Sequence, residues 1–139
     1  MVRLTREGEY AIRGMIRLAR HPKGEALALI PQIARAEGIS AGLLARAFQK
    51  MARAGLVETQ RGAAGGVSLG RPADEISLRD IVEAVEGPVE LNRCLSLRNP
   101  CANAKLCPLS AVWREAQEKM LEVLGKVTLA QVNAPATGA

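Results

Sequence analysis

Hydrophobic side chains recur every three or four residues in three stretches of the first 54 positions, which predicts three short helices. The first is expected to follow Thr5 and to run to about Arg20, with its inward face made by Ile12, Met15, Ile16 and Ala19. The segment His21-Pro22-Lys23-Gly24 ends this helix, because proline and glycine interrupt helical geometry. His21, next to Pro22, is expected at the surface or as a helix cap rather than as a ligand.

The next two predicted helices are joined by a tight turn. The second spans 30–37, with Ile30, Ile33 and Ala34 inward, and the third spans 41–54, with a buried stripe of Leu44, Ala47, Phe48 and Met51. Gly38 suits the left-handed position after a helix, and Ser40 can cap the start of the next one. Two helices joined in this way predict a helix-turn-helix.

A β-hairpin is predicted directly after the third helix. Residues 56–60 and 67–69 have strand character, and the glycine-rich segment 61–66 lies between them. A helix-turn-helix followed by such a hairpin predicts a winged helix. A further short helix is expected over 76–85, capped by Ser77, with Ile81, Val82 and Val85 buried, and Gly87-Pro88 ends it.

The last predicted element is a long amphipathic helix over 109–127. Its apolar positions recur at three and four residues and are Leu109, Val112, Trp113, Ala116, Met120, Val123, Leu124 and Val127. Such a helix after a small domain favours a homodimer seam, and packing on its own domain is the alternative. The fold is thus mainly α, with a small hairpin wing and a long C-terminal dimerisation helix.

This interpretation divides the chain into four parts. Residues 1–87 form the winged helix-turn-helix domain, 88–107 a cysteine loop, 108–132 the dimerisation helix and its cap, and 133–139 a disordered tail. No apolar run reaches the length needed to cross a bilayer, and the first ten residues lack an apolar signal core. We therefore expect a cytoplasmic protein without a membrane partner.

The charge is unevenly distributed along the 139 residues. Residues 1–73 hold 12 Lys and Arg against 5 Asp and Glu, a net +7, whereas residues 74–139 hold 7 against 9, a net −2. A basic first half favours the phosphate backbone of nucleic acid as partner, although a solvated basic surface has the same composition.

The winged-helix interpretation assigns double-stranded DNA contacts to particular residues. The N-terminal part of the third helix enters the major groove, which places Ser40 and Arg46 toward DNA and Lys50 and Arg53 on phosphates or the flanking surface. The wing would contribute Arg61, Gly62, Gly65 and Gly66, because glycines permit close backbone approach and arginine suits a narrow minor groove.

Three cysteines, Cys94, Cys101 and Cys107, lie within fourteen residues of a chain that has no others. Converging thiolates can hold iron, zinc or an iron–sulfur cluster, and thiol redox chemistry is the alternative. An enzyme is not expected. Two G-x-S-x-G matches exist, at 38–42 and 66–70, but the single histidine precedes both and neither match is a strand-to-helix elbow. No small-molecule substrate is predicted.

Several motifs together resemble the winged-helix iron–sulfur transcriptional regulator family of IscR and NsrR, over roughly residues 1–132. They are RLT with EYAIR at 3–13, GIS at 38–40, AGLV at 54–57, the wing glycines, ISL with DIV at 76–82, VEG at 85–87, the three cysteines and TLA at 128–130. The resemblance implies a dimer that binds an operator, usually as a repressor, and senses nitric oxide, redox or iron–sulfur status through a 2Fe–2S or 4Fe–4S cluster.

The resemblance also implies the ligands. The thiolate role passes to Cys94, Cys101 and Cys107. IscR-like members have a histidine three residues after the last cysteine, where this chain has Ser110. NsrR-like members use a carboxylate directly before a tyrosine near the N-terminus, the place of Glu9 here, so Glu9 of the partner subunit is the implied fourth ligand. A glutamate of the IscR recognition helix is Ala45 in this chain, so a different operator preference is expected.

Two other functions remain open on the sequence. A winged-helix repressor without a cluster could be controlled by its thiols or by a protein partner. A structural zinc module would need a fourth cysteine or histidine, for which His21 is poorly placed.

Overall fold

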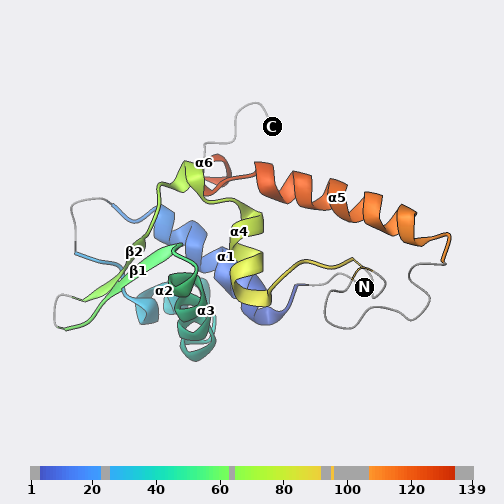
Figure 1. The fold of residues 1–139 in the computed structure, drawn as a ribbon. Helices are drawn as coiled ribbons and strands as arrows, with labels where there is room; N and C mark the ends of the chain where they lie inside the picture. Colours follow the sequence, from blue (N-terminus) through green and yellow to red (C-terminus); the bar gives the residue numbers. More distant parts are fainter. Residues whose placement is uncertain (1–3, 23–25, 63–64, 92–94, 96–106, 134–139) are drawn as a thin grey trace.

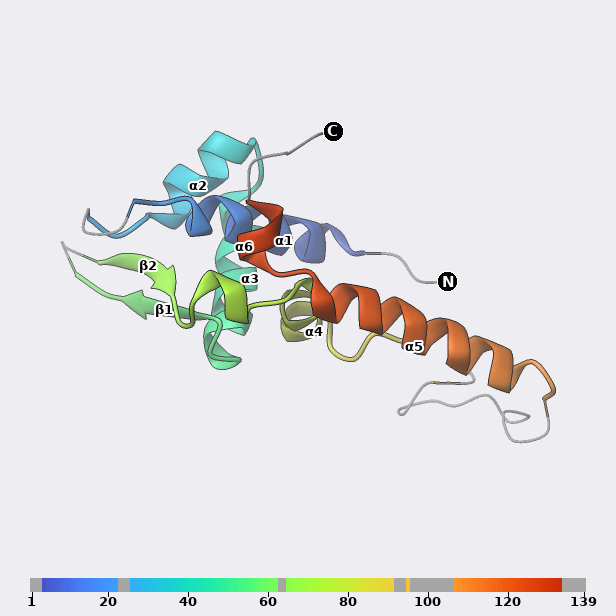
Figure 2. The ribbon, with the colours of Figure 1, turned by 90° about the horizontal axis from the view of Figure 1, so that it is seen from above.

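The computed structural model describes residues 4–22, 26–62, 65–91, 95 and 107–133. It contains helices α1 (Arg6–Ala19), α2 (Ile30–Glu37) and α3 (Ala41–Arg53), strands β1 (Val57–Gln60) and β2 (Gly66–Leu69), the 3-10 turn η1 (Ala73–Glu75), and helices α4 (Leu78–Glu86), α5 (Ser110–Lys126) and α6 (Leu129–Val132). Figures 1 and 2 show a head made of α1–α4, the hairpin and α6, with α5 extending away from it. The mainly helical fold with a hairpin wing is confirmed.

The helix starts and ends follow the local chemistry of the sequence. The Thr5 hydroxyl accepts a hydrogen bond from the Gly8 N–H at 3.0 Å, and the Ser40 hydroxyl accepts from the Leu43 N–H at 3.3 Å. Gly38 ends α2 with φ 66°, the left-handed conformation in which a side chain would be strained. Ser77 and Asp80 form a reciprocal capping box at the start of α4.

The core of the head lies between α1 and α3. Leu44, Ala47, Phe48 and Met51 are fully buried, which confirms the predicted stripe of the third helix. On α1 the buried residues are Ala11, Met15 and Leu18 with two glycines, Gly8 and Gly14, while Ile12, Ile16 and Ala19 are only partly buried. Met15 is confirmed as a core residue and Ile12, Ile16 and Ala19 pack against the core, but the centre of the buried face lies about one residue before the predicted one.

The physical reason for this displacement is the small size of Gly14. A Cβ atom added at Gly14 would lie 2.8 Å from Leu44 Cδ1 and 3.1 Å from Phe48 Cε2. The absence of a side chain lets α1 approach α3 closely, so the buried face of α1 is centred on glycine. A pattern of large apolar residues cannot reveal such a face.

The hairpin β1–β2 is antiparallel, with Val57 opposite Leu69 and Thr59 opposite Val67. It is held to the head by Ala28, whose carbonyl accepts from the Val67 N–H at 2.8 Å. Gly66 has φ 154°, and a Cβ atom there would lie 2.5 Å from the Ala28 carbonyl oxygen. Gly66 is therefore needed for the close contact between the hairpin and Ala28.

The C-terminal segment returns to the head after α5. Leu129 of α6 is fully buried in the head core, and its N–H donates to the Ile76 carbonyl at 3.0 Å. Asn133 was predicted to begin a disordered tail, but its side chain accepts from Arg20 Nε at 2.6 Å and donates to the Ile16 carbonyl at 3.3 Å. These contacts make Asn133 part of the head. The rest of the predicted tail, 134–139, lies outside the described residues.

Helix α5 is packed very differently from the other helices. It lies against α4, and among its described residues only Ser110 is buried. Leu109, Val112 and Val123 are 52%, 55% and 61% exposed and belong to the predicted apolar stripe. The head therefore covers one edge of this stripe and leaves the other edge open.

We predict that Gly14→Val destabilises the protein by about 1–3 kcal/mol, because the added methyl groups overpack the α1–α3 contact. Gly42→Val is the matched control: Gly42 is also helical, but it lies on the exposed side of α3, where a Cβ atom meets nothing closer than 3.8 Å. Urea unfolding measures both. An equal loss of stability in the two variants would contradict the close α1–α3 approach.

Candidate nucleic-acid interface and cysteine segment

The outward face of α3 lies opposite its buried stripe. Arg46, Gln49 and Arg53 are exposed there, and Ser40 stands exposed at the start of the helix. Arg46 and Arg53 thus lie on one solvent-facing side of α3, and Ser40 is exposed at its N-terminal end. Gln49 was missed by sequence reasoning, although its position three residues after Arg46, away from the apolar stripe, was a usable signal.

Lys50 does not belong to this face. Its ammonium group lies 3.1 Å from Glu7 Oε2 of α1 and 3.4 Å from the Val85 carbonyl oxygen of α4. The side chain is 35% exposed. The contact of Lys50 with phosphates or the flanking surface stays a prediction, and in this structure its ammonium group is engaged by Glu7 and Val85.

The wing presents Arg61 and Gly62 to solvent after β1. Gly62 has φ 104° and open space around it, and its carbonyl accepts from the Gly65 N–H at 2.9 Å. Residues 63–64 lie outside the described residues. Arg61 and Gly62 thus remain available for a DNA contact, whereas Gly66 is taken up by the contact with Ala28.

The cysteine segment is described in part. Cys94 and Cys101 lie outside the described residues. Cys107 has a free, half-buried thiol, and its carbonyl accepts from the Ser110 N–H at 3.1 Å as α5 begins. Within the described residues no group of three His, Cys, Asp or Glu side chains is placed to hold a metal ion.

Glu9 lies in the first turn of α1, with its side chain 60% exposed and Arg13 4.0 Å away. This long, exposed pair leaves the carboxylate available to another partner. Ser110, which stands in the place of the IscR-like histidine, is buried at the start of α5. His21 lies just after the end of α1 with Nε2 2.6 Å from the Ala26 carbonyl oxygen.

An apolar groove of about 520 Å³ runs between the start of α1, α4 and α5. Leu4, Ile12, Leu78, Val82, Met120 and Leu124 line it. Val112 and Val123 of α5, and Leu109 directly before it, are exposed. None of the described helices is long and apolar enough to span a membrane.

Residues 4–135 match the Rrf2 family, described as iron-dependent transcriptional regulator. The chain belongs to the Rrf2 family. It is 41% identical to Protein aau3 of Rhizobium meliloti over 129 residues, which cover 92% of this chain and 82% of that protein. It is 32% identical to the HTH-type transcriptional regulator IscR of Xenorhabdus nematophila over 131 residues, covering 94% and 79%.

A solved structure has the same fold. CymR, the global cysteine regulator of B. subtilis, superposes with a TM-score of 0.78 at 29% identity, covering 98% of this chain and 99% of CymR. The expected resemblance is thus confirmed at the level of the family. This Rrf2 protein is a DNA-binding transcriptional regulator and not an enzyme.

We predict that Arg53→Met weakens binding to operator and to unrelated DNA alike. The logarithm of the association constant K falls as the logarithm of the salt concentration rises. Loss of one phosphate contact should make this slope shallower by about 0.9. Arg114→Met, on the exposed polar face of α5, removes the same charge away from α3 and should leave the slope unchanged. Fluorescence anisotropy at several salt concentrations measures both, and equal slopes for the two variants would refute the assignment of Arg53.

Proposed function

We propose that this Rrf2 protein is a homodimeric repressor whose operator affinity is controlled by an iron–sulfur cluster. The proposed ligands are Cys94, Cys101, Cys107 and Glu9 of the partner subunit. The observation that carries the proposal is the group of three cysteines between the DNA-binding head and α5, in a family described as iron-dependent. Three thiolates form a soft donor set suited to iron–sulfur chemistry.

The described donors fit such a group. Cys107 has a free thiol, and Glu9 has an exposed carboxylate without a close ion pair. The buried Ser110 hydroxyl replaces the histidine of IscR-like members, so a carboxylate from elsewhere would complete the set. When bound, a cluster with three thiolates and one carboxylate would supply an iron centre open to nitric oxide, oxygen or iron loss.

Control of DNA binding would follow from where the ligands are attached. The cysteines follow the end of α4, and Glu9 lies on α1, so a ligand set shared between subunits would connect the two heads. This connection would bias the spacing of the two α3 helices. A change of about 1.4–2.8 kcal/mol in operator binding corresponds to ten- to a hundred-fold control.

The exposed edge of α5 supports the dimer. Leu109, Val112 and Val123 are large apolar residues left open to solvent, and Met120 and Leu124 of the same helix line an apolar groove. Burial of this stripe against the same stripe of a second copy would remove it from water, and a two-fold axis makes such a surface self-complementary.

A cluster-free repressor is the second candidate. Its support is the structural similarity to CymR, named a global cysteine regulator, together with the free thiol of Cys107. In that case the cysteines would act as thiol switches or have no regulatory role.

We predict that oxygen-free reconstitution gives a protein with visible absorption and bound iron and sulfide. Cys107→Ala should lose the iron, because one thiolate is removed. Glu9→Gln should retain less iron or lose it faster, while Glu75→Gln, a similarly exposed carboxylate on η1, should behave as the wild type. Binding of zinc without iron would favour a structural zinc module. Absence of metal together with normal regulation in Cys107→Ala would favour the cluster-free repressor.

We predict that Val112→Glu converts the dimer to a monomer, because a carboxylate would be buried in the apolar seam. Arg114→Glu introduces the same residue on the polar face of α5 and should remain dimeric. Analytical ultracentrifugation decides the outcome. A wild-type monomer, or an unchanged dimer in Val112→Glu, would refute the α5 seam.

A further inference from the structure

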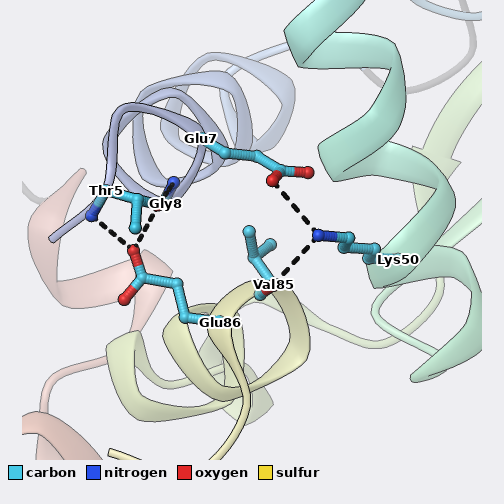
Figure 3. A network of polar contacts seen from close by, with 6 residues as sticks. All are labelled: Thr5, Glu7, Gly8, Lys50, Val85 and Glu86. Carbon is cyan, nitrogen blue, oxygen red and sulfur yellow. Dashed lines mark hydrogen bonds and ion pairs between the residues drawn. The ribbon is translucent and has the colours of Figure 1, made fainter.

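Lys50 joins the recognition helix to two other helices at a single point. Its ammonium group donates to Glu7 Oε2 at 3.1 Å and to the Val85 carbonyl at 3.4 Å (Figure 3). Glu7 is in the first turn of α1, and Val85 is next to the last residue of α4. We call this group, together with Thr5 and Glu86, the three-helix junction.

The Lys50–Glu7 pair is partly buried. The side chain of Glu7 is 16% exposed and that of Lys50 is 35% exposed. Glu7 Oε1 is buried and has no hydrogen-bond partner in the described part of the chain. Lys50 therefore stabilises the charged Glu7 carboxylate. Removal of the ammonium group would leave a poorly solvated carboxylate between α1 and α3.

A second contact joins α1 to α4, the other two helices of the junction. The Glu86 carboxylate accepts from both the backbone N–H and the hydroxyl of Thr5, each at 2.6 Å. Gly8 lies so close to this carboxylate that a Cβ atom there would overlap Glu86 Oε1. The start of α1 and the end of α4 are thus in direct contact, as Figure 3 shows.

The position of the junction along the chain connects it to both proposed ligand segments. Glu86 is the last residue of α4, and the segment with the three cysteines follows it. Glu7 lies two residues before Glu9 on the same helix. Both contacts of Lys50 thus come from helices that carry or precede a proposed ligand segment, and its backbone belongs to the helix with Arg46 and Arg53 on its outward face.

We propose that Lys50 is a positioning residue for DNA recognition: it sets the orientation of α3 through Glu7 and Val85 and does not bind phosphate. We further infer that the same contacts transmit the state of the cysteine segment to α3. This second part rests on the proposed cluster control, whereas the first part does not.

Salt dependence separates positioning from phosphate binding. Lys50→Met should weaken operator binding about five-fold, with an unchanged slope of log K against log salt concentration. Arg53→Met is the matched control and should make the slope shallower by about 0.9. A shallower slope in Lys50→Met would show that Lys50 binds phosphate, and unchanged operator affinity would refute positioning.

Glu7→Gln is a test in which a net-charge effect and a positioning effect predict opposite changes in operator affinity. Removal of a negative charge should strengthen binding to DNA if only net charge matters. If Glu7 and Lys50 position α3, operator binding should instead weaken. Glu75→Gln, with the same charge change outside the junction, is the control. Stronger operator binding in Glu7→Gln would overturn the proposal.

Thermal unfolding of each variant shows whether it is folded at the assay temperature. Lys50→Arg retains the cation and should restore most of the operator affinity lost in Lys50→Met, as expected for a positioning role. If Lys50→Met is unfolded at the assay temperature, the comparison of Glu7→Gln with Glu75→Gln decides the first part.

The second part is tested by the ratio of operator affinities with and without the reconstituted cluster. A wild-type ratio above one that falls toward one in Glu7→Gln supports transmission through the junction. A wild-type ratio above one that is unchanged in Glu7→Gln overturns transmission. A wild-type ratio of one refutes the proposed cluster control itself and leaves the positioning result in force.

Discussion

The close contact between α1 and α3 is the constraint on which the DNA-binding head depends. Gly14 lets the two helices approach until the Leu44 and Phe48 side chains fill the space that a larger residue would occupy. Because this apolar contact fixes the rotation of α3 about its own axis, Arg46 and Arg53 must point away from the core. The basic face is a consequence of packing on the opposite side.

The apolar core also joins α3 to α2 and α4, and polar contacts add a second connection between α3 and the other helices. The Lys50–Glu7 pair and the Glu86–Thr5 contacts gather the ends of three helices at one point, close in sequence to the proposed ligands. Charged contacts of this kind depend strongly on distance and on solvent access. They are therefore better suited than the core to respond to a small displacement.

Helix α5 has a different role in the molecule. Its connection back through α6 fixes its C-terminal end to the head, where Leu129 is buried in the common core. One edge of the apolar stripe remains open along the helix, from Leu109 and Val112 near Cys107 to Val123. A dimer built on α5 would thus place the cysteine segment at the boundary between subunits, where a ligand such as Glu9 could come from the other copy.

The sequence by itself determined the order and nature of the elements, because these depend on local chemistry. Caps at Thr5, Ser40 and Ser77, the left-handed Gly38 and the Leu44–Phe48–Met51 stripe act within a few residues of one another. The cysteine spacing and the short motifs are also local signals, and the membership in the Rrf2 family follows from signals of this kind.

Only the tertiary structure decided how charged residues are used. Lys50 and Arg53 look alike along the chain, but Lys50 meets a carboxylate that is 43 residues away and Arg53 meets solvent. In the same way, Asn133 is bound by Arg20 and Gly66 is required by Ala28. Such pairings join residues that are distant in sequence, so their chemistry depends on how the helices pack and leaves no local pattern in the chain.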